Sequence, residues 1–299
     1  MHIKEEIERL KKKKNAVILV HNYQIPEVQE LADLLGDSLD LSRRASETDA
    51  DIIVFAGVRF MAETAKILSP QKKVLLTGRS AGCPLAEMIT IPELMYMKER
   101  HPDAKVVSYV NTTAEIKSES YICCTSANAV KVVNSVDSKR ILFVPDRNLA
   151  SWVSRFTDRE IIPANGFCYV HEQFTGEDVV MARVRYPDAA IIVHPECRKE
   201  VANLADEVFS TGGMVNFAKK TDKKVIIIGT EEGIISRLKR ENPEKEFYSL
   251  GPKRICLDMK KTKLESVLQT LEEEKYEITI PEDVMERAMV ALERMLSVS

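Results

Sequence analysis

The stretch RHPDAKVVSYVN at residues 100–111 reappears as RYPDAAIIVH at residues 185–194, and residues 14–21 read KNAVILVH on the same pattern. In each copy a charged segment leads into a short apolar run rich in β-branched residues, which is typical of a buried strand. The polar residues that end these runs are His21, Asn111 and His194. A block that recurs three times along a chain predicts three structurally similar units.

Two further apolar runs follow this block in each unit, separated by helical stretches and polar turns. The second runs lie at residues 51–56, 121–124 and 206–209, and the third runs lie at residues 74–76, 141–144 and 225–228. After its third run each unit contains one cysteine, at nearly equal spacing: Cys83, Cys168 and Cys256. Strands that alternate with helices predict parallel sheets of the α/β class.

The expected fold is therefore α/β, with three similar small parallel-sheet domains in a pseudo-threefold arrangement around a central site. The expected domains are residues 1–86, 87–171 and 172–259, followed by a C-terminal helical tail at residues 260–299. The tail should contain a helix at 262–274, a short strand at 276–280 and a helix at 281–296, packed back on the first domain. Because ligands collect at the carboxyl ends of parallel strands, the strand ends of all three domains should share one site.

The composition and charge of the chain argue against several classes of function. The chain has 299 residues, 44% hydrophobic and 30% charged, which is typical of a globular protein. With 43 Lys and Arg against 46 Asp and Glu, its net charge of -3 gives no reason to expect a nucleic-acid partner. No apolar run approaches the ~20 residues of a membrane span, and the N-terminal segment is charged, so we expect a cytoplasmic protein without a membrane partner. Neither the dinucleotide fingerprint nor a phosphate-binding loop is present.

The six cysteines include no Cys-x-x-Cys pair, and in a reducing compartment they favour free thiols or metal ligands over disulfides. Three thiolates from equivalent positions suit either a zinc site completed by histidine or an iron–sulfur cluster with one iron open to substrate. Cys83 fits this reading well because Gly82 and Pro84 place it at a loop tip. The other three have no counterparts in the repeat and are expected to pack as small apolar side chains: Cys123, Cys124 and Cys197.

Titratable and hydrogen-bonding side chains gather where the predicted strands end. They are His21 and Tyr23 in the first unit, Tyr109 and Asn111 in the second, and His194 and Glu196 in the third. A centre that combines histidine, tyrosine and glutamate is equipped for general acid–base steps. Turns containing Ser38, Ser126 and Thr211 add hydroxyls and backbone N–H groups, which bind carboxylate or phosphate without a basic side chain.

These residues and their surroundings resemble the quinolinate synthase family over essentially the whole chain. The resemblance is carried by HNYQ (21–24), GDS (36–38), GVRFMAE (57–63), YVN (109–111), TSANA (125–129), PDRNL (145–149), HPEC (194–197) and STGGM (210–214). It implies three α/β domains around a 4Fe-4S cluster held by Cys83, Cys168 and Cys256, with one iron free of protein ligands. It also implies condensation of iminoaspartate with dihydroxyacetone phosphate to quinolinate, a precursor of NAD, with release of phosphate and water.

The resemblance further implies roles for individual side chains. The residues that would hold the dicarboxylate and its successors are His21, Ser38, Tyr109, Asn111, Ser126, His194, Glu196 and Thr211. Tyr23 and Glu196 are the expected proton carriers, with Tyr109 as a second candidate. The expected partners are the two small-molecule substrates and an enzyme that produces iminoaspartate. The chain departs from the family at Phe167, where histidine is usual before the second cysteine, whereas His171 is retained.

Two other classes of protein use some of the same features. A non-enzymatic iron–sulfur redox sensor would need the three cysteines, but not histidine, tyrosine and glutamate at matching strand ends. A zinc-dependent lyase or hydrolase would replace the cluster with a metal ion held by cysteine and histidine. An optical spectrum distinguishes these classes because iron–sulfur clusters absorb broadly in the visible range and zinc does not.

Overall fold

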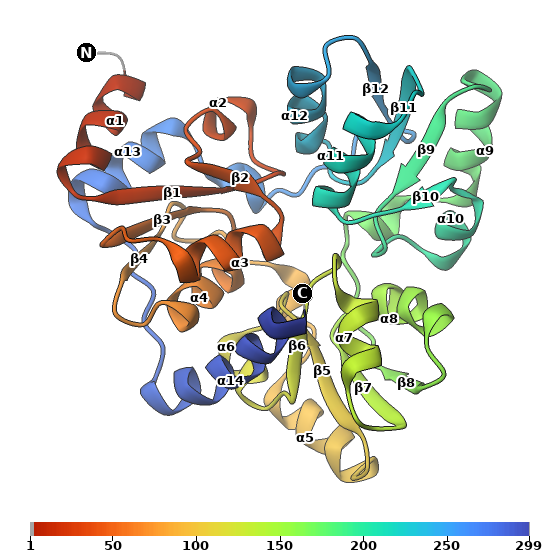
Figure 1. Ribbon diagram of the computed structural model, residues 1–299, viewed down its shortest axis with the longest axis horizontal. Coiled ribbons are helices and arrows are strands. Elements are labelled where there is room, and N and C mark those ends of the chain that lie inside the picture. Colours follow the sequence, from red (N-terminus) through yellow and green to blue (C-terminus); the bar gives the residue numbers. More distant parts are fainter. Residues whose placement is uncertain (1–2, 299) are drawn as a thin grey trace.

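A computed structural model describes residues 3–298 of the protein (Figure 1). Three four-stranded parallel sheets with flanking helices make up this part of the chain. The strand orders are β2-β1-β3-β4, β6-β5-β7-β8 and β10-β9-β11-β12, so each sheet repeats the same topology. The three units surround a common centre in Figure 1. The predicted class, three similar small α/β domains, is confirmed.

The elements of each unit follow one another in the same order. The first unit comprises α1 (Ile3–Lys13), β1 (Ala16–His21), α2 (Pro26–Gln29), β2 (Leu34–Gly36), α3 (Ser38–Glu47), β3 (Ile52–Ala56), α4 (Arg59–Leu68), β4 (Lys73–Leu76) and η1 (Pro84–Glu87). The second comprises α5 (Ile91–Arg100), β5 (Lys105–Tyr109), α6 (Ala114–Ser118), β6 (Ile122–Cys124), α7 (Ala129–Ser135), β7 (Arg140–Val144), α8 (Arg147–Val153), η2 (Ser154–Phe156), β8 (Glu160–Pro163) and η3 (His171–Gln173). The third comprises α9 (Gly176–Arg185), β9 (Ala190–Val193), α10 (Lys199–Leu204), β10 (Glu207–Val208), α11 (Thr211–Lys220), β11 (Val225–Gly229), α12 (Gly233–Glu241), β12 (Glu246–Ser249) and η4 (Met259–Lys261).

The central strands of each sheet are apolar along nearly their whole length. In β3 and β9 every residue is buried, because helices cover both faces of a parallel sheet. One hydrophobic cluster contains residues of all three units, including Phe55, Phe143 and Ile228. Burial of a single phenylalanine side chain stabilises a fold by roughly 1.5–3 kcal/mol, so this shared cluster holds the units together.

The structure corrects the strand count and the matching of the apolar runs. Each unit has four strands, whereas the sequence pattern predicts three. Run 51–56 is β3, the counterpart of β7 and β11, and run 74–76 lies in β4, so the first unit is matched one strand out of step. The short strand β2 and the exposed edge strands β8 and β12 give no strong apolar signal, because half-exposed edges tolerate charged residues.

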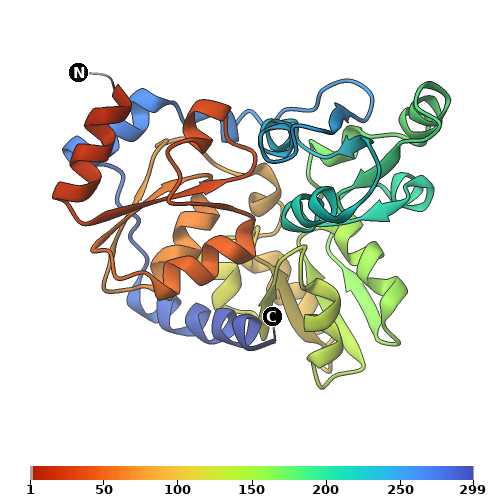
Figure 2. The same cartoon turned by 45° about the horizontal axis from the view of Figure 1, so that its top comes forward.

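The C-terminal segment divides between two units and does not pack on the first alone. Helix α13 (Leu264–Glu273) packs against α1, and Leu75 of β4 forms an antiparallel bridge with Glu277. Helix α14 (Glu282–Val298) packs against α6 and β6 of the second unit as well as α4 of the first (Figures 1 and 2). No helix within residues 3–298 has the length and apolar character needed to cross a bilayer.

Glu274 joins this segment to the first unit through ion pairs with Lys14 (2.7 Å) and Lys73 (2.5 Å). Hydrogen bonds from Lys14 and Lys73 lower the pKa of Glu274 to about 2. We expect Glu274→Gln to reduce the free energy of unfolding by about 0.5–1 kcal/mol at pH 7, since solvent screens both pairs. Because the folded pKa is depressed, this difference should be full above about pH 4.5 and shrink as the pH falls toward 2. Urea unfolding of the unaltered protein and of Glu274→Gln at pH 7 and pH 3 measures this difference in the free energy of unfolding. The same difference at both pH values would contradict the lowered pKa of Glu274.

Candidate active site

The carboxyl ends of the central strands meet at one cavity of about 70 Å³, several times the ~10–15 Å³ that a water molecule occupies by this measure. His21 and Tyr109 are the last residues of β1 and β5, and His194 follows β9 directly. All twelve residues singled out in the sequence line this cavity: His21, Tyr23, Ser38, Cys83, Tyr109, Asn111, Ser126, Cys168, His194, Glu196, Thr211 and Cys256. The three units therefore share one site.

Three free, half-buried thiols enter the cavity from equivalent loops. Cys83 follows β4, Cys168 follows β8 and Cys256 follows β12, each of which is the last strand of its sheet along the chain. Burial raises the pKa of all three thiols. The remaining cysteines are fully buried, and their thiols do not line the cavity: Cys123, Cys124 and Cys197.

A chain of contacts crosses the cavity wall from Tyr23 to Glu196. The Tyr23 hydroxyl lies 2.5 Å from Oγ1 of Thr230, which lies 2.7 Å from Nε2 of His171. On the other side of that ring, Nδ1 lies 2.7 Å from Oε2 of Glu196. This last contact is close but lacks hydrogen-bond geometry, so Nδ1 is buried without a hydrogen-bond partner. The contacts form a continuous path of polar atoms from the Tyr23 hydroxyl to the Glu196 carboxylate.

Burial sets the protonation states in the cavity. It lowers the pKa of His21 and of His194 to about 3, so both imidazoles are neutral near pH 7. It also raises the pKa of Tyr23 and of Tyr109, which therefore keep their protons. Burial opposes the charge on Glu196, but the charge that His171 and His194 carry when protonated and hydrogen bonding by Tyr109 outweigh it and hold the pKa of Glu196 at about 2. The site thus holds neutral proton donors beside one ionised carboxylate.

The remaining polar groups of the cavity differ in whether they already have a hydrogen-bond partner. Oδ1 of Asn111 is buried without a hydrogen-bond partner, a costly state that a bound ligand would relieve. Nε2 of His194 lies 3.2 Å from Oγ of Ser126, and Oγ1 of Thr211 accepts from Asn22 at 2.9 Å. Ser38 and Thr211 begin the ten-residue helices α3 and α11, whose N-terminal ends favour anions. None of the described residues that line the cavity is lysine or arginine.

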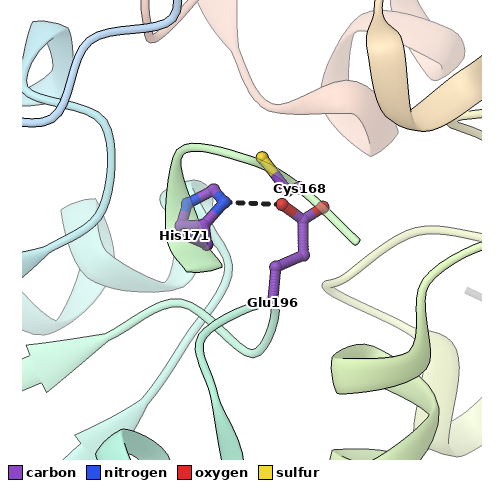
Figure 3. A group of neighbouring side chains, drawn as sticks. All are labelled: Cys168, His171 and Glu196. Carbon is purple, nitrogen blue, oxygen red and sulfur yellow. Dashed lines mark ion pairs between the residues drawn. The ribbon is translucent and has the colours of Figure 1, made fainter. Parts of the chain in front are cut away.

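The polar residues that sequence reasoning left without a role include His171, Thr230 and Glu231. The position of His171, three residues after Cys168, was a usable signal because the turn η3 brings both side chains to the same wall. Figure 3 shows Cys168, His171 and Glu196 pointing toward one another, and their donor atoms lie within 4.8 Å of each other. These three could also hold a single metal ion. Phe167, which stands where the family usually has histidine, packs against Arg147. The central carbon of the Arg147 guanidinium lies 4.5 Å from the centre of the Phe167 ring.

An α/β protein that brings acid–base side chains and three thiols from three repeated units into one buried cavity is built as an enzyme. The family model described as "Quinolinate synthetase A protein" matches residues 5–297. The chain belongs to the quinolinate synthase family, whose product is a precursor of NAD. The quinolinate synthase of Thermodesulfovibrio yellowstonii is 54% identical over 294 residues, which cover 98% of this chain and 97% of that protein. The quinolinate synthase of Methanoregula boonei is 52% identical over 295 residues, covering 99% and 98%.

Proposed function

We propose that this enzyme condenses iminoaspartate with dihydroxyacetone phosphate to quinolinate, releasing phosphate and water, with a 4Fe-4S cluster held by Cys83, Cys168 and Cys256. The observation that carries the proposal is the meeting of these thiols, one from each unit, in the cavity that holds Tyr23 and Glu196. A redox sensor would need the thiols alone.

The donor set fits such a cluster. Cluster irons are bound by thiolates, and three cysteines leave the fourth iron without a protein ligand. When bound, the cluster would supply an open Lewis-acid iron for an oxygen atom of the substrate. A mononuclear zinc site at Cys168, His171 and Glu196 is the competing assignment. In that assignment His171 and Glu196 would give up the contact they make with each other, and two of the three equivalent thiols would have no function.

Hydrogen bonding, without cationic side chains, orients the substrates. The neutral imidazoles of His21 and His194 and the hydroxyls of Ser38 and Ser126 can donate to carboxylate oxygens. The N-terminal ends of α3 and α11 add a favourable electrostatic potential for the dicarboxylate or the phosphate. Such a site binds an anion through several neutral hydrogen-bond donors and helix ends, without a fixed positive charge. Phosphate can therefore leave the site after it has been released from the substrate.

Proton transfer is assigned to Tyr23 and Glu196, which lie at the two ends of the series of contacts through Thr230 and His171. Forming a pyridine from an imine and a triose phosphate requires removal of several protons and protonation of a departing oxygen. Glu196 is ionised and accepts protons, whereas Tyr23 is protonated and donates one. Thr230 and His171 lie between the two groups and connect them by close polar contacts.

The unpartnered oxygen of Asn111 yields a prediction about binding. Asn111→Ala removes an amide that is available to substrate, so KM should rise roughly 10-fold, the equivalent of one hydrogen bond to a polar ligand. The matched control is Asn242→Ala, which alters a buried asparagine at the end of α12 outside the cavity. Steady-state kinetics that give the same KM for both variants would show that Asn111 does not contact substrate.

Anaerobic metal analysis tests the proposal. Freshly purified protein should contain about four irons and four sulfides per chain, the content of one 4Fe-4S cluster, and absorb broadly in the visible range. A colourless protein that contains one zinc per chain would instead establish the mononuclear site. An iron–sulfur protein that forms no quinolinate from the two substrates would favour the redox sensor.

We further place the reaction in the cytoplasm, because a reducing compartment keeps the six cysteines as free thiols. The expected functional partner is an enzyme that produces iminoaspartate, since an imine hydrolyses in water and is best consumed as it forms.

A further inference from the structure

Each cysteine loop is tied to its own sheet by an equivalent backbone hydrogen bond. The donor is the residue three positions beyond the end of β3, β7 or β11, and the acceptor is the carbonyl two residues before the cysteine. These bonds are Arg59 N to Ala81 O (2.9 Å), Arg147 N to Gly166 O (2.8 Å) and Glu232 N to Arg254 O (3.1 Å). The repeat in the fold therefore extends to the loops that carry the thiols.

A buried carboxylate precedes this donor in two of the units. Oδ2 of Asp146 accepts from the backbone N–H of Cys168 at 3.2 Å, and its Oδ1 accepts from Leu149 at the start of α8 at 2.7 Å. Oε1 of Glu231 accepts from the N–H of Cys256 at 3.1 Å, and its Oε2 accepts from Gly233 at the start of α12 at 2.7 Å. Both acidic side chains are fully buried.

The first unit lacks this carboxylate. Its equivalent position is Val58, which precedes Arg59 and whose side chain has no acceptor atom. Instead Asp258, two residues beyond Cys256, accepts from the N–H of Gly82 at 3.2 Å. The loop of Cys83 is thus held across the interface by the cysteine loop of the third unit.

We propose that Asp146, Glu231 and Asp258 are positioning residues that fix the three cysteine loops for cluster binding. The inference rests on the cluster assigned above. A buried carboxylate is costly unless donors fill its lone pairs, and here the ligand loops supply donors to both Asp146 and Glu231. Groups that orient metal ligands through hydrogen bonds typically change metal affinity 10- to 100-fold when removed. In this proposal the motif PDRNL at residues 145–149 contributes Asp146, which holds the loop of Cys168.

The first test removes one bond and keeps the helix cap. In Asp146→Ser the hydroxyl can still cap α8 at Leu149 but is too short to reach Cys168 at the same time. We expect iron release to a chelator to become roughly 10- to 100-fold faster than in the unaltered protein. The matched control is Thr113→Ala, which removes the side-chain cap of α6 at Ile116, outside the three cysteine loops. Equal release rates in Asp146→Ser and Thr113→Ala would overturn the proposal.

The second test needs no metal and compares thiol reactivity in the cluster-free protein. Asp146→Ser should accelerate alkylation of Cys168 roughly tenfold or more and leave Cys256 unchanged, because only its own loop is released. Glu231→Ala should show the reverse pattern, since it removes the acceptor of the Cys256 N–H. Mass spectrometry locates the modified thiols. Uniform rates at both cysteines would refute the positioning role even if the cluster forms, whereas failure of the unaltered protein to bind iron would refute only the cluster.

Discussion

Replacing Cys168 by serine should abolish cluster assembly, with iron and sulfide per chain falling to background after anaerobic reconstitution. Serine offers a hydroxyl in place of the thiolate that iron–sulfur clusters require, and two cysteines cannot hold the cluster in the shared cavity. Cys83→Ser and Cys256→Ser should behave alike, because the three loops are equivalent in the repeat.

Cys197→Ser supplies the matched control. Its thiol is buried and donates to the carbonyl of Gly229 at 3.4 Å, and it does not line the cavity. This variant should retain the full iron and sulfide content. Normal content in Cys168→Ser, or loss of the cluster in Cys197→Ser to the same degree, would contradict the ligand assignment.

Tyr23→Phe and Glu196→Gln should each lower kcat by about 10²- to 10⁴-fold, the usual effect of losing a group that transfers a proton. Phenylalanine keeps the ring that packs edge-on against His21 and removes only the hydroxyl that meets Thr230. Glutamine keeps the shape of Glu196 but cannot accept the proton. Because both changes act on a chemical step, KM should change less than kcat.

The same substitutions at remote positions are the controls. Tyr186→Phe alters a ring stacked on Tyr248 in the third unit, and Glu119→Gln alters a carboxylate paired with Lys98 and Arg287. Both should keep near-normal turnover. Iron content is measured for every variant, so a loss of activity with a normal cluster is attributable to proton transfer. Normal turnover in both Tyr23→Phe and Glu196→Gln would place the proton carriers elsewhere.

The sequence predicts the parts of this site that depend on position along the chain. His21, Tyr109 and His194 could be placed because a buried apolar run leads directly into each, and strand ends face the ligand edge of a parallel sheet. The three cysteines could be grouped because they recur after equivalent runs. Neither inference required knowledge of which side chains touch.

The parts that depend on contact between units could not be predicted. Thr230 belongs to the third unit and hydrogen-bonds Tyr23 of the first, and nothing in either stretch specifies this pairing. Asp258 supports the loop of Cys83 from a different unit, although the repeat suggests that each unit should support its own. The strand matching of the first unit went out of step because β2 (Leu34–Gly36) contains no β-branched or aromatic residue, whereas β6 contains Ile122 and β10 contains Val208.

Anaerobic turnover with iminoaspartate and dihydroxyacetone phosphate tests the central claim most directly. The iron–sulfur-loaded protein should form quinolinate and release phosphate in equal amounts, whereas the cluster-free and the zinc-loaded protein should form none. Quinolinate formation at the same rate by cluster-free protein would contradict the account, as would an iron–sulfur-loaded protein that consumes neither substrate.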